Sequence, residues 1–233
     1  MIRIKLFLLL SVCALFARGQ YGNHISVDPF VAVFGTAQVQ YERPINSDNT
    51  MSVGLSLGYK TSSGVFELPG ISSDKITTDD FNFNGIKIIP EFRWYTQKQG
   101  FSGFYTGAYL KYQHYTGNIE GIYVDNDSEQ STIDLDAKIK TYAAGLEVGY
   151  KLMVGNRFFL DFLIAGPGLS FNTFELDENA PLPSAFYDDL SEALSEYGIF
   201  ESIDTDFEID ANAKSETKAL PAFRYGIKIG YSF

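Results

Sequence analysis

The side chains best placed to do chemistry are charged residues that recur at alternate positions of extended segments. Every second side chain of such a segment points to the same face, so these charges would share one interior. Charges removed from water must pair and hydrogen-bond, or else line a path for ions. We expect a salt-bridge network, with a narrow ion path as the alternative and Glu91 and Arg93 as the leading pair. The predicted set is Asp28, Glu42, Lys87, Glu91, Arg93, Lys111, Glu147, Lys151, Asp161, Arg224 and Lys228.

Three segments carry this pattern most clearly, namely 51–59, 142–152 and 223–233. In each of them one face is apolar and the other holds charged or small residues, which is typical of a strand between two unlike surroundings. A soluble sandwich and a membrane barrel both fit that description. The ten steps from Phe223 to Phe233 rise about 25 Å at a tilt near 40°, which matches the apolar band of a membrane barrel. Sandwich strands are usually about half as long, so the barrel is favoured.

Short turns at 46–49, 97–100 and 154–156 alternate with long polar segments at about 61–81, 116–134 and 175–218. Strands are expected at about 50–60, 82–96, 101–115, 136–152, 156–173 and 219–233. Splitting 23–45 into a hairpin at Gly35-Thr36 gives the even strand number that single-chain bacterial barrels have. We predict an all-β fold, an eight-stranded antiparallel transmembrane β-barrel with short periplasmic turns and long extracellular loops. Pro90 lies in mid-strand and is expected to need a bulge.

The N-terminus predicts an export signal at 1–19. Arg3 and Lys5 precede an apolar stretch at 6–16, and Ala17-Arg18-Gly19 offers small residues for cleavage before Gln20. The barrel would then occupy 20–233, without a disulfide because the single cysteine leaves with the signal. The formal net charge of −11 argues against a nucleic-acid partner, which would need a basic face.

The last long segment, 173–218, is expected to be an acidic extracellular loop. Its part from Glu175 to Lys218 holds 13 acidic residues and two lysines, which equals the whole formal net charge of −11. Pro183 and the apolar spacing after it predict a short amphipathic helix. The alternating carboxylates Asp204, Asp206, Glu208 and Asp210 could attract Ca²⁺. They lack the turn glycine of a dedicated calcium loop, so no metal site and no cofactor are predicted.

The chain resembles the small eight-stranded outer-membrane barrels of Gram-negative bacteria. It is most similar to an uncharacterised barrel family with a Tyr-Glu-Arg step and a Pro-Glu-x-Arg-x-Tyr strand, here Tyr41-Glu42-Arg43 and Pro90-Glu91-Phe92-Arg93-Trp94-Tyr95. The terminal Tyr231-Ser232-Phe233 resembles the signal by which such proteins reach the barrel-assembly machinery, with Tyr231 and Phe233 as its key residues. The resemblance implies a fold and an outer-membrane location, but no activity.

Nucleophilic catalysis has little support, because a base needs a nucleophile and an orienting acid within reach. His24-Ile25-Ser26 resembles the His-x-Ser step of lipid A deacylases, but it falls at the periplasmic end of its strand, away from the outer leaflet where that chemistry occurs. His114 lies near the outer rim but has no serine beside it. Both histidines are expected at a rim or in solvent.

We therefore expect a structural or binding barrel that anchors acidic loops, is not an enzyme and is a monomer. Its partners would be outer-membrane lipid, the barrel-assembly machinery and a ligand or protein at the loops. The alternatives are a small or gated pore and a lipid-modifying enzyme.

Overall fold

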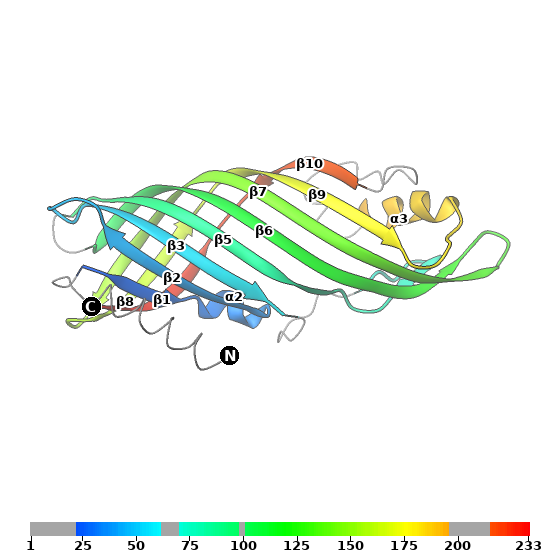
Figure 1. Cartoon of the computed structure of the whole chain (residues 1–233), viewed down its shortest axis with the longest axis horizontal. Coiled ribbons are helices and arrows are strands. Elements are labelled where there is room, and N and C mark those ends of the chain that lie inside the picture. The colour runs from blue at the N-terminus through cyan, green and yellow to red at the C-terminus, as the bar shows by residue number, and fades with distance from the viewer. Residues whose placement is uncertain (1–21, 62–69, 98–100, 196–214) are drawn as a thin grey trace, which may run out of the picture.

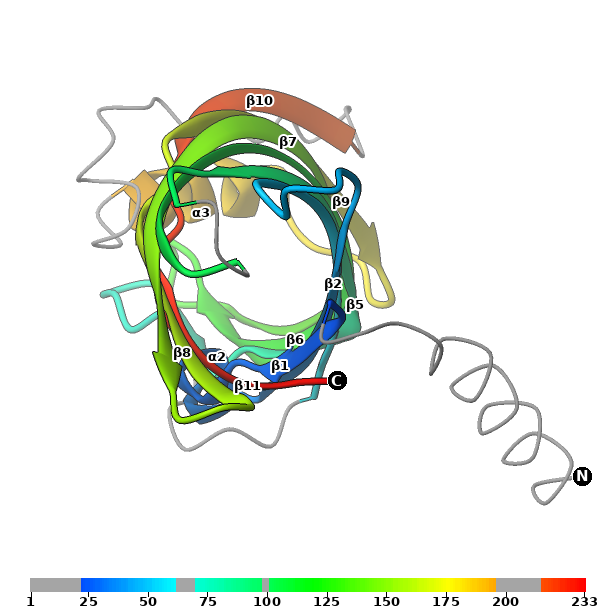
Figure 2. The same ribbon diagram turned by 90° about the vertical axis from the view of Figure 1, so that its left-hand side faces the viewer.

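Strands with one polar and one apolar face can close on an interior, and in the computed structural model they wrap into a barrel (Figures 1 and 2). The structure describes residues 22–61, 70–97, 101–195 and 215–233. The predicted signal peptide at 1–19 and the acidic stretch at 204–210 lie outside the described residues.

Eight antiparallel strands form the described barrel wall, so the predicted fold class is confirmed. Two of these wall strands are interrupted, β8 continuing into β9 and β10 into β11, and a short β4 pairs only with β6. The pairing of β11 with β1 and of β6 with β7 closes the ring. The strands are β1 (His24–Val27), β2 (Thr36–Pro44), β3 (Met51–Lys60), β4 (Ile76–Thr78), β5 (Asn82–Tyr95), β6 (Gly103–Val124), β7 (Gln130–Val154), β8 (Phe158–Ala165), β9 (Gly168–Glu178), β10 (Ser215–Ala222) and β11 (Gly226–Ser232).

The predicted first hairpin is only partly correct. Strand β1 ends at Val27, and the short helix α2 (Pro29–Val33) replaces the rest of the expected strand. The Asp28 side chain accepts hydrogen bonds from the backbone N–H groups of Phe30 and Val31, and Pro29 follows it at the first helical turn. A capping carboxylate followed by proline is a helix-start signal, and here it overrides the alternating pattern. Gly35, at φ 76°, then turns the chain into β2.

The expected loop at 116–134 is wrong, because β6 and β7 run on as one hairpin from Gly103↔Lys151 to Val124↔Gln130. The connection is a tight turn at 125–129, where the Asp125 carboxylate accepts from the N–H groups of Asp127 and Glu129. Strands of 22 and 25 residues are much longer than the barrel wall needs, so they carry the sheet well beyond it (Figure 1).

The bulge expected at Pro90 is also wrong. Strand β5 keeps one register with β3 and one with β6, and the ladder to β6 is interrupted only at Ile89 and Pro90. The missing N–H of proline is therefore accommodated by a local gap in the hydrogen bonds. A register shift is recorded instead between β7 and β8, at Val148 and Gly149.

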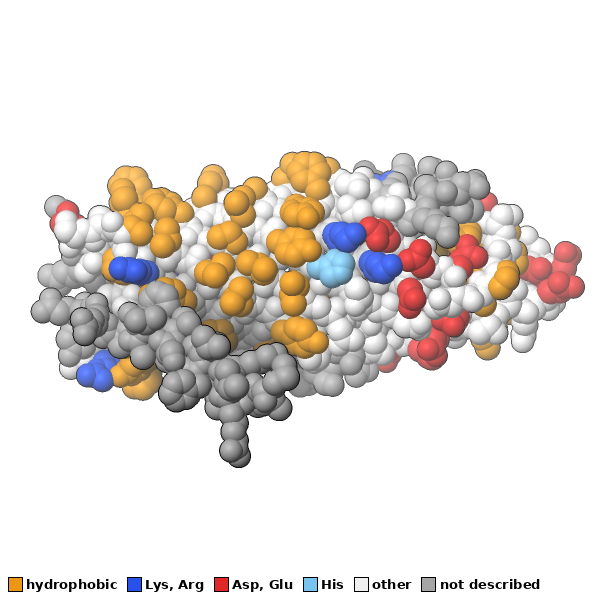
Figure 3. Space-filling view, viewed as in Figure 1, with side chains coloured by type: hydrophobic (Ala, Val, Ile, Leu, Met, Phe, Trp, Pro, Cys, Tyr) orange, Lys and Arg blue, Asp and Glu red, His pale blue; other side chains and the backbone are white. Residues whose placement is uncertain are grey.

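The outward face of β6 and β7 changes character at one level. Up to the paired Tyr112 and Tyr142, whose ring centroids lie 5.2 Å apart, the outward residues are mostly apolar. Beyond them come His114 and Lys140, then carboxylates and amides. Figure 3 shows the apolar side chains banded over the barrel and the acidic ones over the opposite end. We call the apolar-banded part the barrel, its end with the short connections the turn end, and residues 70–81, 114–140 and 172–195 the head.

The head packs a hydrophobic core against the inner face of its sheet. Helix α3 (Ala185–Ser195) confirms the helix predicted in the last segment, and it places Phe186 and Leu190 beside Tyr123. The buried core is Ile71, Ile76, Tyr123, Ile133, Leu135, Phe186, Tyr187 and Leu190. Among the described residues, no helix has the length and apolar composition needed to cross a membrane.

Candidate functional site

The charges on the inner wall of the barrel converge on one arginine. Arg93 of β5 is fully buried, and its three guanidinium nitrogens reach carboxylates on other strands as well as its own. Nε lies 2.9 Å from Glu147, Nη1 2.7 Å from Asp161 and Nη2 2.9 Å from Glu91, while Glu42 lies 3.5 Å from Nη1. One planar side chain therefore connects β2, β5, β7 and β8 across the lumen.

Lys151 is the second buried cation of this group. Its ammonium donates to Glu42 and lies 3.2 Å from Nδ1 of His24. Glu42 also accepts hydrogen bonds from the Ser52 hydroxyl at 2.6 Å and the Tyr95 hydroxyl at 2.7 Å. The carboxylate is thus fully engaged, as a buried charge must be.

Arg224 and Lys228 complete the group from the last wall strand. Arg224 donates to Glu91 at 2.6 Å and to Glu147 at 3.3 Å. Lys228 lies 3.7 Å from Glu91 and donates to the Gln40 amide oxygen at 2.7 Å, and Gln40 in turn donates to Glu91. We call these residues the charge cluster, which comprises Glu42, Glu91, Glu147, Asp161, Arg93, Lys151, Arg224 and Lys228.

The charge cluster holds four acidic and four basic residues, so its formal charge is zero. Four of its eight side chains have no exposed surface, and Arg224 is the least buried at 12%. Removing so many charges from water is costly unless each is paired and hydrogen-bonded, and that condition is met here. A closed, neutral network of this kind can brace the wall strands and obstruct the lumen.

Aromatic side chains close the lumen at the turn end. Tyr95, Phe101 and Tyr105 are fully buried and pack together, and the Tyr105 hydroxyl donates to Asp161 at 2.8 Å. The Arg93 guanidinium lies 4.4 Å from the centre of the Tyr105 ring. Gly149 faces this ring, and a Cβ there would lie 2.3 Å from Tyr105. Inward glycines therefore provide the room that these large rings occupy.

The alternating pattern places Tyr95, Tyr105, Gln40 and Ser52 on the inner face, although the predicted set contained only charged residues. Their position could have been read from the same periodicity, because a buried carboxylate needs neutral donors as well as cations. The position of Phe101 could not be predicted in this way, because Phe101 lies in a connection between strands, with its own φ at 49°, and enters the lumen from there.

Three predicted residues lie outside the charge cluster. Asp28 is buried but caps α2. Lys87 and Lys111 face the lumen on the side of the cluster toward the head, and they stay partly exposed. Among the described residues, no carboxylate forms a salt bridge with either lysine.

His24 was expected at a rim or in solvent, and it lies near the turn end of the barrel but not in solvent. It is buried, stacks on Phe159 with ring centroids 4.7 Å apart and meets Phe101 edge-on at 5.1 Å. His114 faces outward just beyond the apolar band, and its Nδ1 has no hydrogen-bond partner among the described residues. The two histidines are therefore held in separate surroundings, one in the aromatic layer and one on the outer surface.

The predicted assembly-signal residues lie at the turn end. The Tyr231 ring packs edge-on against Phe158 at 5.4 Å, and its hydroxyl accepts a hydrogen bond from Arg157 at 2.7 Å. The backbone of Phe233 exchanges hydrogen bonds with Asn23, which ties the C-terminus to the start of the first wall strand.

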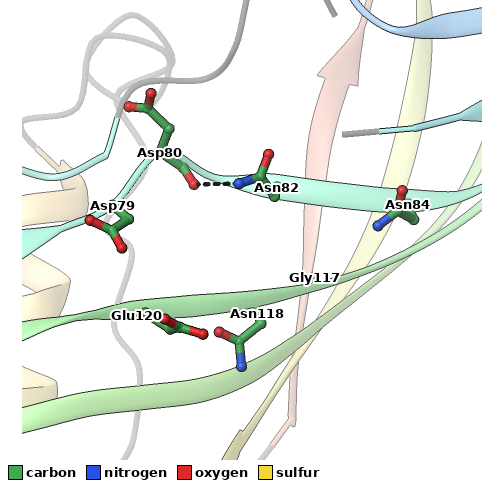
Figure 4. A pocket seen from close by; sticks show the side chains of 7 residues that line it. All are labelled: Asp79, Asp80, Asn82, Asn84, Gly117, Asn118 and Glu120. Atoms are coloured by element: carbon green, nitrogen blue, oxygen red, sulfur yellow. Dashed lines mark hydrogen bonds between the residues drawn. The ribbon is translucent and has the colours of Figure 1, made fainter. Parts of the chain in front are cut away.

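A polar pocket of about 540 Å³ opens on the head (Figure 4). Its lining has carboxylates and amides, and the Asn82 amide donates to the backbone oxygen of Asp80 at 3.2 Å. Within the described part of the chain, no group of three or more histidine, cysteine or acidic residues is arranged to hold a metal ion. The lining residues are Asp79, Asp80, Asn82, Asn84, Gly117, Asn118 and Glu120.

Helix α3 is fastened to the head by polar contacts as well as by its apolar face. Asp189 accepts from Lys75 at 2.7 Å and from the Tyr123 hydroxyl at 2.7 Å. Burial opposes ionisation of Asp189, but these two hydrogen bonds and the Lys75 charge hold its pKa below the ordinary value. Burial and the bond to Asp189 raise the pKa of Tyr123 to about 12, so the phenol stays protonated as a donor.

Comparison with known proteins supplies a family but no activity. No similar protein was found among the curated proteins, and no similar fold among the solved structures. A family model described as "Protein of unknown function (DUF3575)" matches residues 7–177, which is more than half of the chain. This small β-barrel protein therefore belongs to the DUF3575 family.

Proposed function

We propose that the protein is an outer-membrane barrel of a Gram-negative bacterium that does not conduct ions and that anchors its head for binding outside the cell. The observation that carries this proposal is Arg93, which is fully buried and contacts four carboxylates from four wall strands. A barrel that fills its lumen in this way serves better as a rigid support than as a channel.

The apolar band supports a membrane position. Leu152 and Tyr142 face outward at the two ends of the band on β7, and ten residues of strand at a tilt near 40° rise about 25 Å. Such a height equals that of the apolar band of outer-membrane barrels, and aromatic pairs at both edges suit the membrane–water interface. The edge pairs are Phe104–Tyr150, Phe158–Tyr231 and Tyr112–Tyr142.

The connections support an orientation. The turn end has short links and holds the C-terminus, whereas the head extends from the opposite end, and bacterial barrels place short turns in the periplasm. In this orientation the head projects outside the cell. The barrel would be a monomer in outer-membrane lipid, delivered there by the assembly machinery that reads Tyr231 and Phe233.

The acidic composition of the last long segment supports a binding role for the head. Its 13 acidic residues and two lysines make this segment strongly negative, so it would attract a basic protein surface or cations. The proposal assigns no catalytic step to the protein.

Location is tested by cell fractionation combined with gel mobility before and after boiling. We expect the full chain in the outer-membrane fraction, with a folded form that migrates differently when unboiled. A protein recovered in the water-soluble fraction without detergent would overturn the membrane assignment.

Conduction is tested in planar bilayers. The purified barrel is expected to be silent, whereas reproducible single-channel steps that change with Glu91→Gln would show a pore instead. The binding role is tested by replacing Asp204, Asp206, Glu208 and Asp210 with their amides and measuring retention of a basic test protein on intact cells. Unchanged retention would contradict a binding head, and altered lipid A on overexpression would point to an enzyme.

A further inference from the structure

Two lysines inside the barrel form no salt bridge with the described residues, whereas each of the four cations of the charge cluster does. Lys87 and Lys111 lie on the neighbouring strands β5 and β6, two positions out of register, since Lys87 pairs with Gln113. The charged groups that act on Lys87 are Lys111, Asp28, Arg224 and Lys228, three of which are cations.

Among the described residues, the nearby charged groups form no salt bridge with these lysines. Asp28 accepts the N–H groups of Phe30 and Val31 at 3.0 and 3.2 Å, both with Oδ1, and its charge acts on Lys87 without forming a salt bridge. Arg224, which also acts on Lys111, is itself a cation and is paired with Glu91 and Glu147. Two like charges in a confined lumen repel each other unless an anion lies between them.

Two buried oxygens on the neighbouring wall strands also have no hydrogen-bond partner among the described residues. They are Oε1 of Gln38, on β2, and Oγ of Ser56, on β3, and their residues are only 6% and 1% exposed. Buried polar atoms are nearly always hydrogen-bonded, so each such exception asks for a partner.

Gly58 lies on β3, between Lys87 on β5 and Gln38 on β2, and two residues from Ser56. It pairs with Gln38 on one side and Lys87 on the other, and a Cβ at Gly58 would lie 3.1 Å from Cε of Lys87 and 3.4 Å from Cγ2 of Thr36. The Lys87 side chain therefore lies across β3 toward β2. Because Gly58 has no side chain, the Lys87 side chain can lie in the space beside it, and we call this part of the inner wall, with Gln38 and Ser56 on the same face, the trough.

We propose that this trough binds a phosphate-type oxyanion that carries a hydroxyl group. The ammonium groups of Lys87 and Lys111 supply the charge, the Ser56 hydroxyl donates to an anionic oxygen, and the Gln38 amide oxygen accepts the proton of the ligand hydroxyl. At neutral pH sulfate carries no proton and offers only hydrogen-bond acceptors, so it cannot donate to the Gln38 amide oxygen. Phosphate and a phosphate monoester headgroup share the required chemistry.

Access to the trough differs from access to the charge cluster. Lys87 and Lys111 remain partly exposed, while Arg93 and Lys151 are fully buried. The wall beside the trough is also unusual, because α2 replaces strand β1 beyond Val27 and packs its Phe30 ring 5.5 Å from Tyr225. A ligand can therefore come from the head side or past α2 from lipid.

The proposal is tested by calorimetric titration of the full chain in a non-ionic detergent at neutral pH. The probes are inorganic phosphate, sulfate and a short-chain phosphatidic acid. We expect phosphate or phosphatidic acid to bind about tenfold more tightly than sulfate, and Lys87→Gln and Lys111→Gln each to weaken that binding about tenfold. Phosphate binding assigns the site to a free solute, and binding of phosphatidic acid alone assigns it to a lipid headgroup.

Lys140→Gln is the matched control, because it removes one positive charge from the outer surface, where Lys140 pairs with Glu175. It should leave binding unchanged, and Ser56→Ala should weaken binding without changing the charge. Unboiled gel mobility shows that each variant is folded, and the changes at 56 and 111 keep the test available if Lys87→Gln fails to fold. Absence of binding to both phosphate probes, or equal binding by both lysine variants and the wild type, would overturn the proposal. Equal affinity for sulfate would overturn the role of Gln38.

Discussion

The barrel and the head share strands β6 and β7 but place their apolar residues on opposite faces. In the barrel, Leu146 faces outward at 67% exposure while Glu147 beside it is buried in the lumen. In the head, Leu135 and Ile133 are buried on the inner face while Asp134 and Asp136 face outward. The strands keep one register throughout, so the inversion comes from the sequence and not from a bulge.

This inversion indicates that the two regions meet different surroundings outside. A sheet whose outer face is apolar and whose interior is charged suits lipid, and the reverse arrangement suits water. The outer face changes from apolar to polar between two successive outward pairs, Tyr112–Tyr142 and His114–Lys140. The barrel is accordingly held together by paired charges, and the head by a hydrophobic core of the ordinary soluble kind.

The largest effect is expected from Arg93→Gln, which breaks the centre of the charge cluster. Four carboxylates would lose their shared cation, and breaking a buried ion pair costs about 3–5 kcal/mol of unfolding free energy. Urea unfolding in phospholipid vesicles measures this loss, with the single tryptophan, Trp94, as a fluorescence reporter on the outer face of the barrel. Arg224→Gln is the control, because its side chain is less buried and should cost less. Equal costs would contradict the central role of Arg93.

A charge on the apolar band should cost nearly as much if the band faces lipid. Leu146→Arg near mid-band is expected to lower the unfolding free energy by about 2–4 kcal/mol. The same urea titration applies, and Asn118→Arg on the outer face of the head is the control, expected to stay within about 0.5 kcal/mol. If both variants were equally stable, the two regions would share one environment and the comparison would fail.

A cavity in the head should act locally. Leu190→Ala removes a buried side chain from the core between α3 and the sheet, which typically costs about 2–3 kcal/mol. We expect faster amide hydrogen exchange in α3 and β4, with no change in the urea midpoint reported by Trp94. A matching shift of that midpoint would mean that barrel and head unfold as one unit.

The smallest effect is a pH dependence of α3 docking. Because the folded pKa of Asp189 is lowered, its contact with Lys75 adds stability above the ordinary carboxyl pKa of about 3.9 and loses it as pH falls through the folded value. Amide exchange in α3, corrected for its intrinsic pH dependence, should therefore rise more steeply below about pH 4 than exchange in β5. Asp189→Asn should remove this difference, and Asp188→Asn, on the exposed side of α3, should not.

Some of these features could be predicted because they depend on local order alone. The period of two placed Glu42, Glu91 and Glu147 on one face, and the spacing after Pro183 predicted α3. The head was missed because inverted alternation looks like a polar loop when only its outward residues, such as Asp134 and Asp136, are considered. The tight turn at 125–129 was not predicted, although residues 125–128, Asp-Asn-Asp-Ser, are of types that favour turns.

The amino-acid sequence by itself determined which faces are apolar, where the short turns lie and therefore that the chain closes as an eight-stranded barrel, because side-chain alternation is a property of each strand. Only the tertiary structure decided which charges meet. Arg93 reaches Asp161, which is 68 positions away in the chain, and Lys151 reaches Glu42, which is 109 positions away. Such pairings depend on strand tilt and register around the closed wall, which no single strand contains. The same closure left Lys87 and Lys111 without a salt bridge to any described residue, and this is what makes them the part of the lumen to test first.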